Sequence, residues 1–134
     1  MIENISELKV MGDDRGKLSV IEGGIDVPFD IKRVFYIYDV NTSATRGAHA
    51  HYKTKQFLVP VSGRCKVTLD NGQEKHTFEL NKPNICLFQD AMIWGTMHDF
   101  SDDCVLMILA DDHYDDSDYI RNYNKFLEVA KNDS

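Results

Sequence analysis

The chain has 134 residues, of which 43% are hydrophobic and 28% are charged, and its formal net charge is −7. This length suits a single domain spanning residues 1–134, and the composition is that of a folded protein, neither disordered nor embedded in a membrane. An acidic chain lacks the broad basic surface that nucleic-acid binding requires, so we expect no nucleic-acid partner.

Membrane and secretion signals are missing from the sequence pattern. Residues 1–4 have no basic and apolar run of the secretory kind, and the longest apolar run, residues 105–110, is too short to cross a bilayer. Three cysteines, at positions 65, 86 and 104, form no C-x-x-C pair, which favours a reducing compartment. We therefore predict a cytoplasmic protein with no membrane partner.

Short apolar or alternating segments separated by turn residues run from residue 17 to residue 110 and predict an all-β sandwich or barrel. Asn71-Gly72 predicts a hairpin turn, and Ser62-Gly63 predicts a second tight turn. The expected strands are 17–22, 31–40, 56–61, 64–69, 73–79, 85–88 and 104–109.

The C-terminal tail carries the main helical pattern. Ile120, Tyr123, Leu127 and Ala130 recur at helical spacing, and Ser117 is a suitable N-terminal cap, which predicts a helix over residues 117–131. Asp118 then lies in the first turn, where the helix dipole favours a negative charge. Residues 1–15 form an N-terminal strand region.

The segment from Arg46 to Lys53 contains the residues best suited to chemistry. In an extended strand, residues two apart face the same side, so His49 and His51 are expected to present both imidazoles together. Imidazole titrates near pH 6.5 and can accept or donate a proton at neutral pH. The alternative is a pair of ordinary surface or core histidines.

Several further side chains are candidates for substrate binding. Guanidinium groups fit phosphate oxygens well, so Arg46 and Arg15 could hold a diphosphate, although exposed surface arginines are equally common. Arg33 alternates with apolar neighbours and is a third candidate. Trp94, in an expected loop, could stack on a base or sugar as readily as pack in the core. The remaining candidates are Tyr36 and His98.

The spacing G-x-H-x-H, then Gln56, then Gly63 resembles the first motif of the cupin superfamily, which implies a small jelly-roll barrel with an internal pocket. Metal-binding cupins carry a carboxylate where Gln56 stands and a further histidine near Gly95. Two histidines alone are a poor site for a divalent ion. We therefore expect no metal, although His98 as a substitute ligand leaves a metal-dependent cupin enzyme as an alternative.

A narrower resemblance covers nearly the whole chain. The combination of R-G-x-H-x-H at residues 46–51 with Y-x-x-x-D-Y-I-R-x-Y at residues 114–123 is similar to the 3,4-ketoisomerases of dTDP-4-keto-6-deoxyglucose. This resemblance implies an isomerase without metal or redox cofactor that moves the sugar carbonyl from C4 to C3 through an enediol. It also implies a homodimer with exchanged N-terminal strands, and a role in making 3-amino sugars for surface polysaccharide.

The resemblance assigns His49 as the principal base and His51 as its partner or proton donor. Arg46 and Arg15 would contact the sugar or the diphosphate. Two departures stand out, because many relatives have tyrosine at Phe35 and a large polar residue at Gly95. They leave the configuration at C4 of the product open, and they are the best support for an alternative, a cupin that binds a nucleotide sugar without turnover.

Overall fold

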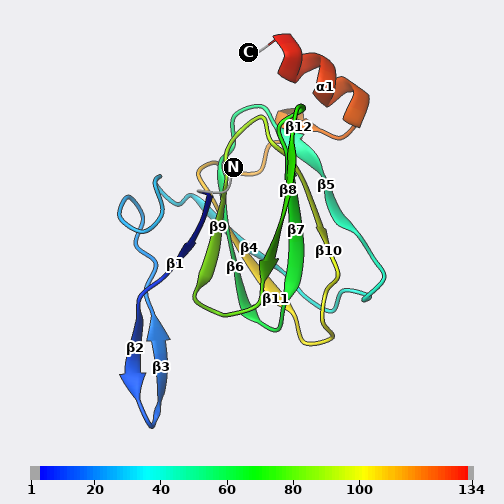
Figure 1. The fold of residues 1–134 in the computed structure, drawn as a ribbon. Helices are drawn as coiled ribbons and strands as arrows, with labels where there is room; N and C mark the ends of the chain where they lie inside the picture. Colours follow the sequence, from blue (N-terminus) through cyan, green and yellow to red (C-terminus); the bar gives the residue numbers. More distant parts are fainter. Residues whose placement is uncertain (1–3, 133–134) are drawn as a thin grey trace.

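Two antiparallel five-stranded sheets face each other in the computed structural model, which describes residues 4–132 (Figure 1). The strand orders are β1-β9-β6-β11-β4 and β12-β5-β10-β7-β8, and β2 and β3 form a separate hairpin. The elements are β1 (Ile5–Glu7), β2 (Val10–Asp13), β3 (Gly16–Ser19), β4 (Arg33–Ile37), β5 (Arg46–His51), β6 (Gln56–Ser62), β7 (Cys65–Asp70), β8 (Lys75–Leu80), β9 (Ile85–Gln89), β10 (Trp94–His98), β11 (Val105–Ala110), the 3₁₀ helix η2 (Asp116–Asp118), β12 (Tyr119–Ile120) and α1 (Tyr123–Asn132). The predicted all-β jelly roll with a short C-terminal helix is thus confirmed.

The core between the two sheets is apolar and closely packed. Leu58, Val67, Leu69, Leu106 and Ile108 are completely buried there. They come from alternate positions on β6, β7 and β11, because side chains two apart on a strand face the same side. The sheets are not hydrogen-bonded into a closed barrel within residues 4–132, and β4 and β12 remain as neighbouring free edges of the two sheets.

A second layer covers the outer face of each sheet. On the first sheet, Phe57 and Val59 point outward and are buried by Val27 and its neighbours in the segment between β3 and β4. On the second sheet, Ile120 and Phe126 pack with Trp94 beneath α1. Both strand faces are therefore apolar over most of the sandwich, and strict polar alternation is lost, as is usual for strands covered on both sides.

The two turns predicted from Gly and Asn are confirmed. Asp70 pairs with Lys75 at the end of the β7–β8 hairpin, and the Asn71 side chain accepts hydrogen bonds from the backbone N–H groups of residues 73 and 74. Gly72 and Gly63 have φ angles of 96° and 64°, which a glycine adopts without steric cost.

Strand boundaries differ from the prediction where loops are apolar. The strand expected over 17–22 is the shorter β3, and the one expected over 31–40 is reduced to β4, because Ile21 and Ile31 pack as loop residues onto the first sheet. The segment around Trp94, expected as a loop, is strand β10, which lies between β5 and β7. Strands β1 and β2 lie in the N-terminal strand region predicted over residues 1–15, of which residues 1–3 are outside the described residues, whereas β12 falls in the predicted helix.

The helix predicted over 117–131 begins six residues later. Residues 116–118 form η2, which Asp115 caps by accepting from the Ser117 backbone N–H at 3.0 Å, and α1 starts only at Tyr123. The Asn122 side chain accepts from the Lys125 N–H at 2.9 Å and is the cap of α1. Ser117 is therefore not the helix cap, and Asp118 does not lie in the first turn of α1.

The β2–β3 hairpin extends away from the two sheets, on the side opposite α1 (Figure 1). Its apolar side chains Val10, Met11 and Leu18 are exposed, although a two-stranded hairpin needs further packing to be stable. Within residues 4–132, no helix is long and apolar enough to cross a membrane.

The turn at Gly63 provides a test of the fold. A Cβ at this position would lie 2.5 Å from side-chain atoms of Asp103 and Ser101, in addition to its positive φ. We expect Gly63→Ala to lower the free energy of unfolding by about 3 kcal/mol, from left-handed strain and overpacking together. The measurement is urea unfolding followed by fluorescence.

Gly24→Ala is the matched control. Gly24 also has a positive φ, 79°, but a Cβ there meets no atom within 4 Å. It is expected to lose only about 1 kcal/mol, the cost of the backbone conformation alone. Equal losses in the two variants would show that the crowding at Gly63 has no energetic effect.

Candidate active site

A cavity of about 280 Å³ lies between the sheets at their unpaired edges, where β4 faces β5 and β12. Nine residues line it, contributed by β4, β5, β6, β10 and β12: Phe35, Tyr36, Ile37, Arg46, Gly47, His49, Gln56, Met97 and Tyr119. Its lining mixes apolar side chains with an imidazole, a guanidinium, an amide and phenol groups, which suits a polar small molecule.

A β-bulge in β5 places His49 in this cavity. Gly95 of β10 pairs with His49 while its neighbour Thr96 pairs with Gly47, so Ala48 is an extra residue without a partner. Gly47 and Ala48 have φ angles of 80° and 58°. Bulges of this kind change the direction of a side chain next to a functional site. The bulge precedes His49, and regular alternation from His49 to His51 then keeps both imidazoles on the inner face.

The hydrogen bond of His49 determines which ring nitrogen is free. Its Nδ1 lies 3.2 Å from the carbonyl oxygen of Gly47, which can only accept, so Nδ1 carries the proton and Nε2 keeps its lone pair. The pKa of His49 is lowered to about 4, chiefly by burial and also by the nearby His51, while the bond to the Gly47 carbonyl opposes both effects. His49 is therefore neutral at pH 7 with an available acceptor nitrogen.

His51 lies behind His49, away from the cavity. Only 2% of its surface is exposed, and its Nδ1 donates to the Asp118 carboxylate over 3.3 Å. Burial lowers the pKa of His51 despite the opposing effect of Asp118. The Nε2 atom of His51 is buried without a hydrogen-bond partner in the described structure. His51 is thus a neutral, enclosed ring: the two imidazoles are neighbours, with ring centroids 5.1 Å apart, but His49 lines the cavity and His51 does not.

Asp118 organises this part of the site. Its carboxylate accepts from the backbone N–H groups of Lys53 and Thr54, at 2.9 and 3.3 Å, and from the Thr54 hydroxyl, in addition to His51. Its carbonyl oxygen accepts from the Tyr52 N–H at 2.9 Å. A buried carboxylate with this many donors anchors η2 and β12 to the turn that follows β5.

Tyr119 is the cross-strand neighbour of His51. The two residues pair in the β12–β5 ladder, and the Tyr119 ring centroid lies 4.4 Å from that of His51 and 5.0 Å from that of His49. The Arg121 guanidinium lies 4.3 Å from the centre of the Tyr119 ring and forms an ion pair with Asp116 at 2.9 Å. Tyr119 therefore closes the cavity beside both histidines.

The positions that would hold further metal ligands in a cupin carry none here. Gln56 is buried and lines the cavity with a neutral amide, and Gly95 has no side chain. The space beside Gly95 is taken by Gln89, whose Nε2 would be 2.6 Å from a Cβ at that position. Across residues 4–132, no group of three or more His, Cys, Asp or Glu side chains could hold a metal ion together.

The three predicted cationic residues have different positions. Arg46 lines the cavity directly. Arg33 has a buried Nε without a partner in the described structure, and its guanidinium lies over the ring of Phe35 at 5.1 Å. Arg15 is at the tip of the β2–β3 hairpin, with 90% of its side chain exposed and an ion pair to Asp13 at 2.7 Å. Within one chain, Arg15 is not part of the cavity.

Of the other predicted substrate-binding residues, Trp94 and His98 lie outside the cavity in this single chain, and Tyr36 lies at its border. Trp94 is 9% exposed and packs on Tyr123 and Phe126 at 5.2 and 5.7 Å, so it is a core residue beneath α1.

Strand alternation explains the other two positions. His98 lies on the same outer face as Trp94, with its Nε2 2.8 Å from the Thr68 hydroxyl. Tyr36 borders the cavity but is 61% exposed, and its ring packs on Tyr38 because alternation along β4 turns Phe35 inward.

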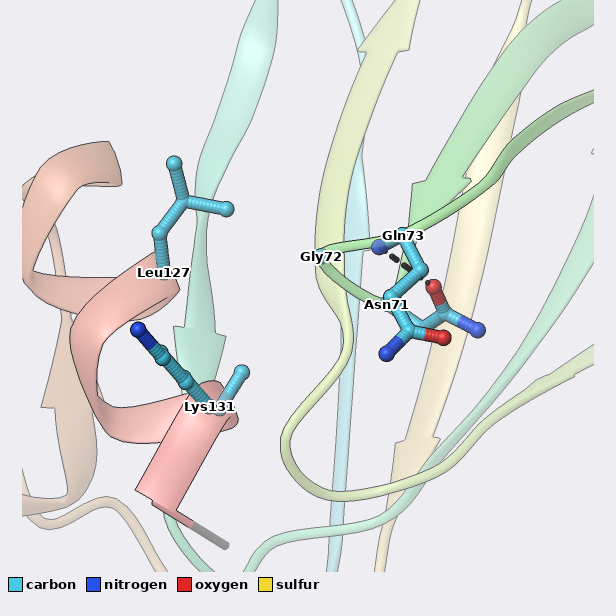
Figure 2. Close-up of a pocket in the computed structure, with 6 residues that line it drawn as sticks. Asn71, Gly72, Gln73, Leu127 and Lys131 are labelled. Atoms are coloured by element: carbon cyan, nitrogen blue, oxygen red, sulfur yellow. Dashed lines mark hydrogen bonds between the residues drawn. The ribbon is translucent and has the colours of Figure 1, made fainter. Parts of the chain in front are cut away.

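A second hollow of about 340 Å³ lies between α1 and the β7–β8 turn (Figure 2). Leu127 and Lys131 of α1 line one side of it, and on the other side Asn71 closes the turn by accepting from the Gln73 N–H. The lining has an ammonium group and neutral amides but no carboxylate, imidazole or thiol. It therefore offers no acid or base for proton transfer, unlike the cavity at His49.

Sequence reasoning did not assign roles to Asp118, Tyr119 and Arg121, although all three stand in the D-Y-I-R motif. Asp118 was explained by a helix dipole because it precedes the helical pattern. The alternation of Tyr119 and Ile120, one polar ring followed by one apolar side chain, is the signal that could have indicated a short strand instead.

Comparisons with known proteins agree on one group of enzymes. The family model described as "FdtA: WxcM-like, C-terminal" matches residues 1–131. The chain is 44% identical over 132 residues to the TDP-4-oxo-6-deoxy-alpha-D-glucose-3,4-oxoisomerase of Aneurinibacillus thermoaerophilus, covering 98% of this chain and 95% of the relative.

Among solved structures, QdtA, a sugar 3,4-ketoisomerase from Thermoanaerobacterium thermosaccharolyticum in complex with TDP, superposes with a TM-score of 0.94. Its identity to this chain is 42%, over 99% of this chain and 98% of QdtA. A variant of QdtA has also been solved with TDP-4-keto-6-deoxyglucose, and that structure has a TM-score of 0.93 and 42% identity, over 98% and 97% of the two chains.

The enclosed position of His49 predicts an unusual titration. Because burial disfavours the imidazolium, its protonation should occur at a pH near 4 rather than near 6.5. The measurement is NMR of a sample labelled at the histidine rings, with His49 assigned from a His49→Asn variant. A His49 midpoint near 6.5 would contradict the assignment of a desolvated neutral base.

Proposed function

Since the chain belongs to the FdtA (WxcM-like, C-terminal) family, we propose that it is a sugar-nucleotide 3,4-ketoisomerase that converts TDP-4-keto-6-deoxyglucose to a TDP-3-keto-6-deoxyhexose. Relatives that match almost its full length bear this activity or this substrate in their names. The single observation that carries the proposal is the free Nε2 of neutral His49 in a cavity of suitable size.

The reaction requires a base and no redox change. The hydrogen on C3 is acidic because the neighbouring C4 carbonyl stabilises the enediolate that its removal leaves. His49 accepts this proton at Nε2, and proton return at C4 completes the shift of the carbonyl from C4 to C3. Nδ1 stays bonded to the Gly47 carbonyl throughout, which keeps the ring in one orientation.

His51 supports this base from behind. Its hydrogen bond to Asp118 holds the ring in one tautomer, and its neutral state avoids a second positive charge next to the imidazolium that His49 becomes. His51 therefore remains the partner of His49 in the proposed catalytic pair, because it supports the base and does not itself take the C3 proton.

Cations around the cavity would hold the nucleotide diphosphate. Arg46 lines the opening, and the buried unpartnered Nε of Arg33 is a donor that a substrate oxygen would satisfy. Guanidinium groups bind phosphate oxygens through two parallel hydrogen bonds, which compensates locally for the acidic chain.

Arg15 fits the site only in a dimer. The exposed apolar hairpin that carries it needs a covering surface. The exposed Val34 on the free edge strand β4, with the exposed Tyr38 directly after the strand, offers one in a second copy. We place Arg15 at the substrate of the partner subunit, in a homodimer with exchanged N-terminal segments.

The chemistry of the product indicates which reaction consumes it. A 3-keto sugar is the substrate that a pyridoxal-phosphate aminotransferase needs to make a 3-amino-3,6-dideoxy sugar, and such sugars are components of surface polysaccharide, including the O-antigen of lipopolysaccharide. Nucleotide sugars are made in the cytoplasm, where we place this enzyme. The isomerisation itself needs neither an added cofactor nor a metal.

Replacing the base tests the proposal directly. His49→Asn removes the acceptor nitrogen, and kcat should fall at least about 100-fold, since general base catalysis contributes roughly 10²–10⁴-fold. The measurement is NMR of TDP-4-keto-6-deoxyglucose in D₂O, following loss of the C3 hydrogen and formation of the 3-keto product. Binding of TDP by calorimetry should be retained.

His76→Asn, in β8 on the far sheet edge, is the control and should match the wild type. Retained C3 exchange in His49→Asn would rule out His49 as the base. Wild-type protein that binds TDP without turnover would favour a binding cupin, and activity lost on chelation would favour a metal-dependent enzyme.

The dimer generates a separate prediction. Light scattering should give twice the 15.4 kDa mass of one chain. Mixing and refolding the His49→Asn and Arg15→Ala variants should restore up to about one site in four. Random pairing makes about half of the dimers mixed, and in each mixed dimer one of the two sites combines an intact His49 from one chain with an intact Arg15 from the other. A monomer, or mixtures no more active than the two variants measured separately, would contradict the shared site.

A further inference from the structure

Proton transfer at the sugar oxygens needs a second group in the cavity, and resting on the function proposed above, we infer that this group is Tyr119. Moving a carbonyl from C4 to C3 requires a proton to reach O4 and another to leave O3. His49 has one free nitrogen, which the carbon-bound proton occupies. The oxygen-bound protons must therefore pass through a different side chain.

The other polar groups around the cavity are unsuited to this transfer. The only N–H of neutral His51 is bonded to Asp118 and its Nε2 carries no proton, so this ring has no proton to give to O4. The Gln56 amide cannot release a proton, and the Arg46 guanidinium stays protonated. Phe35 has no hydroxyl, and Tyr36 turns its ring to the outer face.

Tyr119 meets the requirements by position. It lines the cavity, its ring centroid is 5.0 Å from that of His49, and its hydroxyl makes no hydrogen bond within the described residues. Its place is well defined, because pairing with His51 in the β12–β5 ladder and the Asp118 anchor next to it fix the backbone. Arg121, 4.3 Å from the ring centre, supplies positive charge where loss of the phenolic proton leaves negative charge.

The steps balance without another reactant. His49 Nε2 takes the C3 proton, the electron pair forms the C3–C4 double bond, and O4 takes the phenolic proton of Tyr119. The resulting enediol faces an imidazolium and a phenolate. The phenolate then takes the proton of the C3 hydroxyl as the C3 carbonyl forms, and C4 takes the imidazolium proton. Both side chains return to their starting states.

Because His49 moves the carbon-bound proton and Tyr119 moves the oxygen-bound protons, the configuration of the product is determined. One imidazole serves both carbons, so the proton leaves C3 and reaches C4 on the same face of the ring. In a gluco sugar the hydrogens of C3 and C4 lie on opposite faces, so transfer on one face makes the C4 hydroxyl axial. The expected product is therefore the 3-keto-6-deoxy sugar of galacto configuration.

Tyr119→Phe tests the inference, since it keeps the ring contacts and removes only the hydroxyl. We expect kcat to fall about 100-fold or more, the range of general acid–base catalysis, with KM and the Kd for TDP changed less than about threefold. Tyr52→Phe, which removes the hydroxyl of an exposed ring directly after β5, is the matched control and should keep wild-type kcat. NMR coupling between the C4 and C5 hydrogens of the product reports the C4 configuration.

A kcat for Tyr119→Phe within threefold of the wild type, or a loss confined to KM or TDP binding, would overturn the inference. An equatorial C4 hydroxyl in the wild-type product would also overturn it, because C4 would then be protonated from the opposite face. These outcomes require active wild-type protein, whereas wild-type protein that leaves TDP-4-keto-6-deoxyglucose unchanged would refute the proposed function itself.

Discussion

The buried Asp118 carboxylate is the interaction on which the rest of the site depends. It accepts two backbone N–H groups, the Thr54 hydroxyl and the His51 Nδ1, so one side chain joins η2 and β12 to the end of β5. Removing its partners from water is costly unless every donor is satisfied, and these donors meet that condition. The same contacts place Tyr119 against the two imidazoles, which links the stability of this corner to its chemistry.

Desolvation keeps His49 and His51 neutral before substrate binds. His49 and His51 both have a lowered pKa because they are desolvated, and each uses Nδ1–H on an oxygen acceptor. Each ring is therefore held in one tautomer with Nε2 unprotonated. Only His49 presents that nitrogen to the cavity, and this asymmetry distinguishes the base from its supporting residue.

Side-chain alternation decides the contents of the cavity more than residue type does. On β10, Gly95 faces inward and leaves room for the Gln89 amide, whereas Trp94 and His98 face outward to α1 and Thr68. On β4 the same rule turns Phe35 inward. Neighbouring residues on a strand face opposite sides of the sheet, so an aromatic or histidine residue one position away from an inward-facing residue lies outside the site.

The sequence by itself determined the all-β class, the turns at Gly63 and Asn71-Gly72, and the common face of His49 and His51, because these depend on local backbone preferences and a two-residue period. It misplaced the start of the helix and missed Tyr119, because a two-residue strand has no periodic signal of its own. Only the tertiary structure decided that His49 opens to the cavity while His51 is enclosed. That difference arises from contacts with residues about 70 positions away along the chain, among them Asp118, which local sequence patterns do not encode.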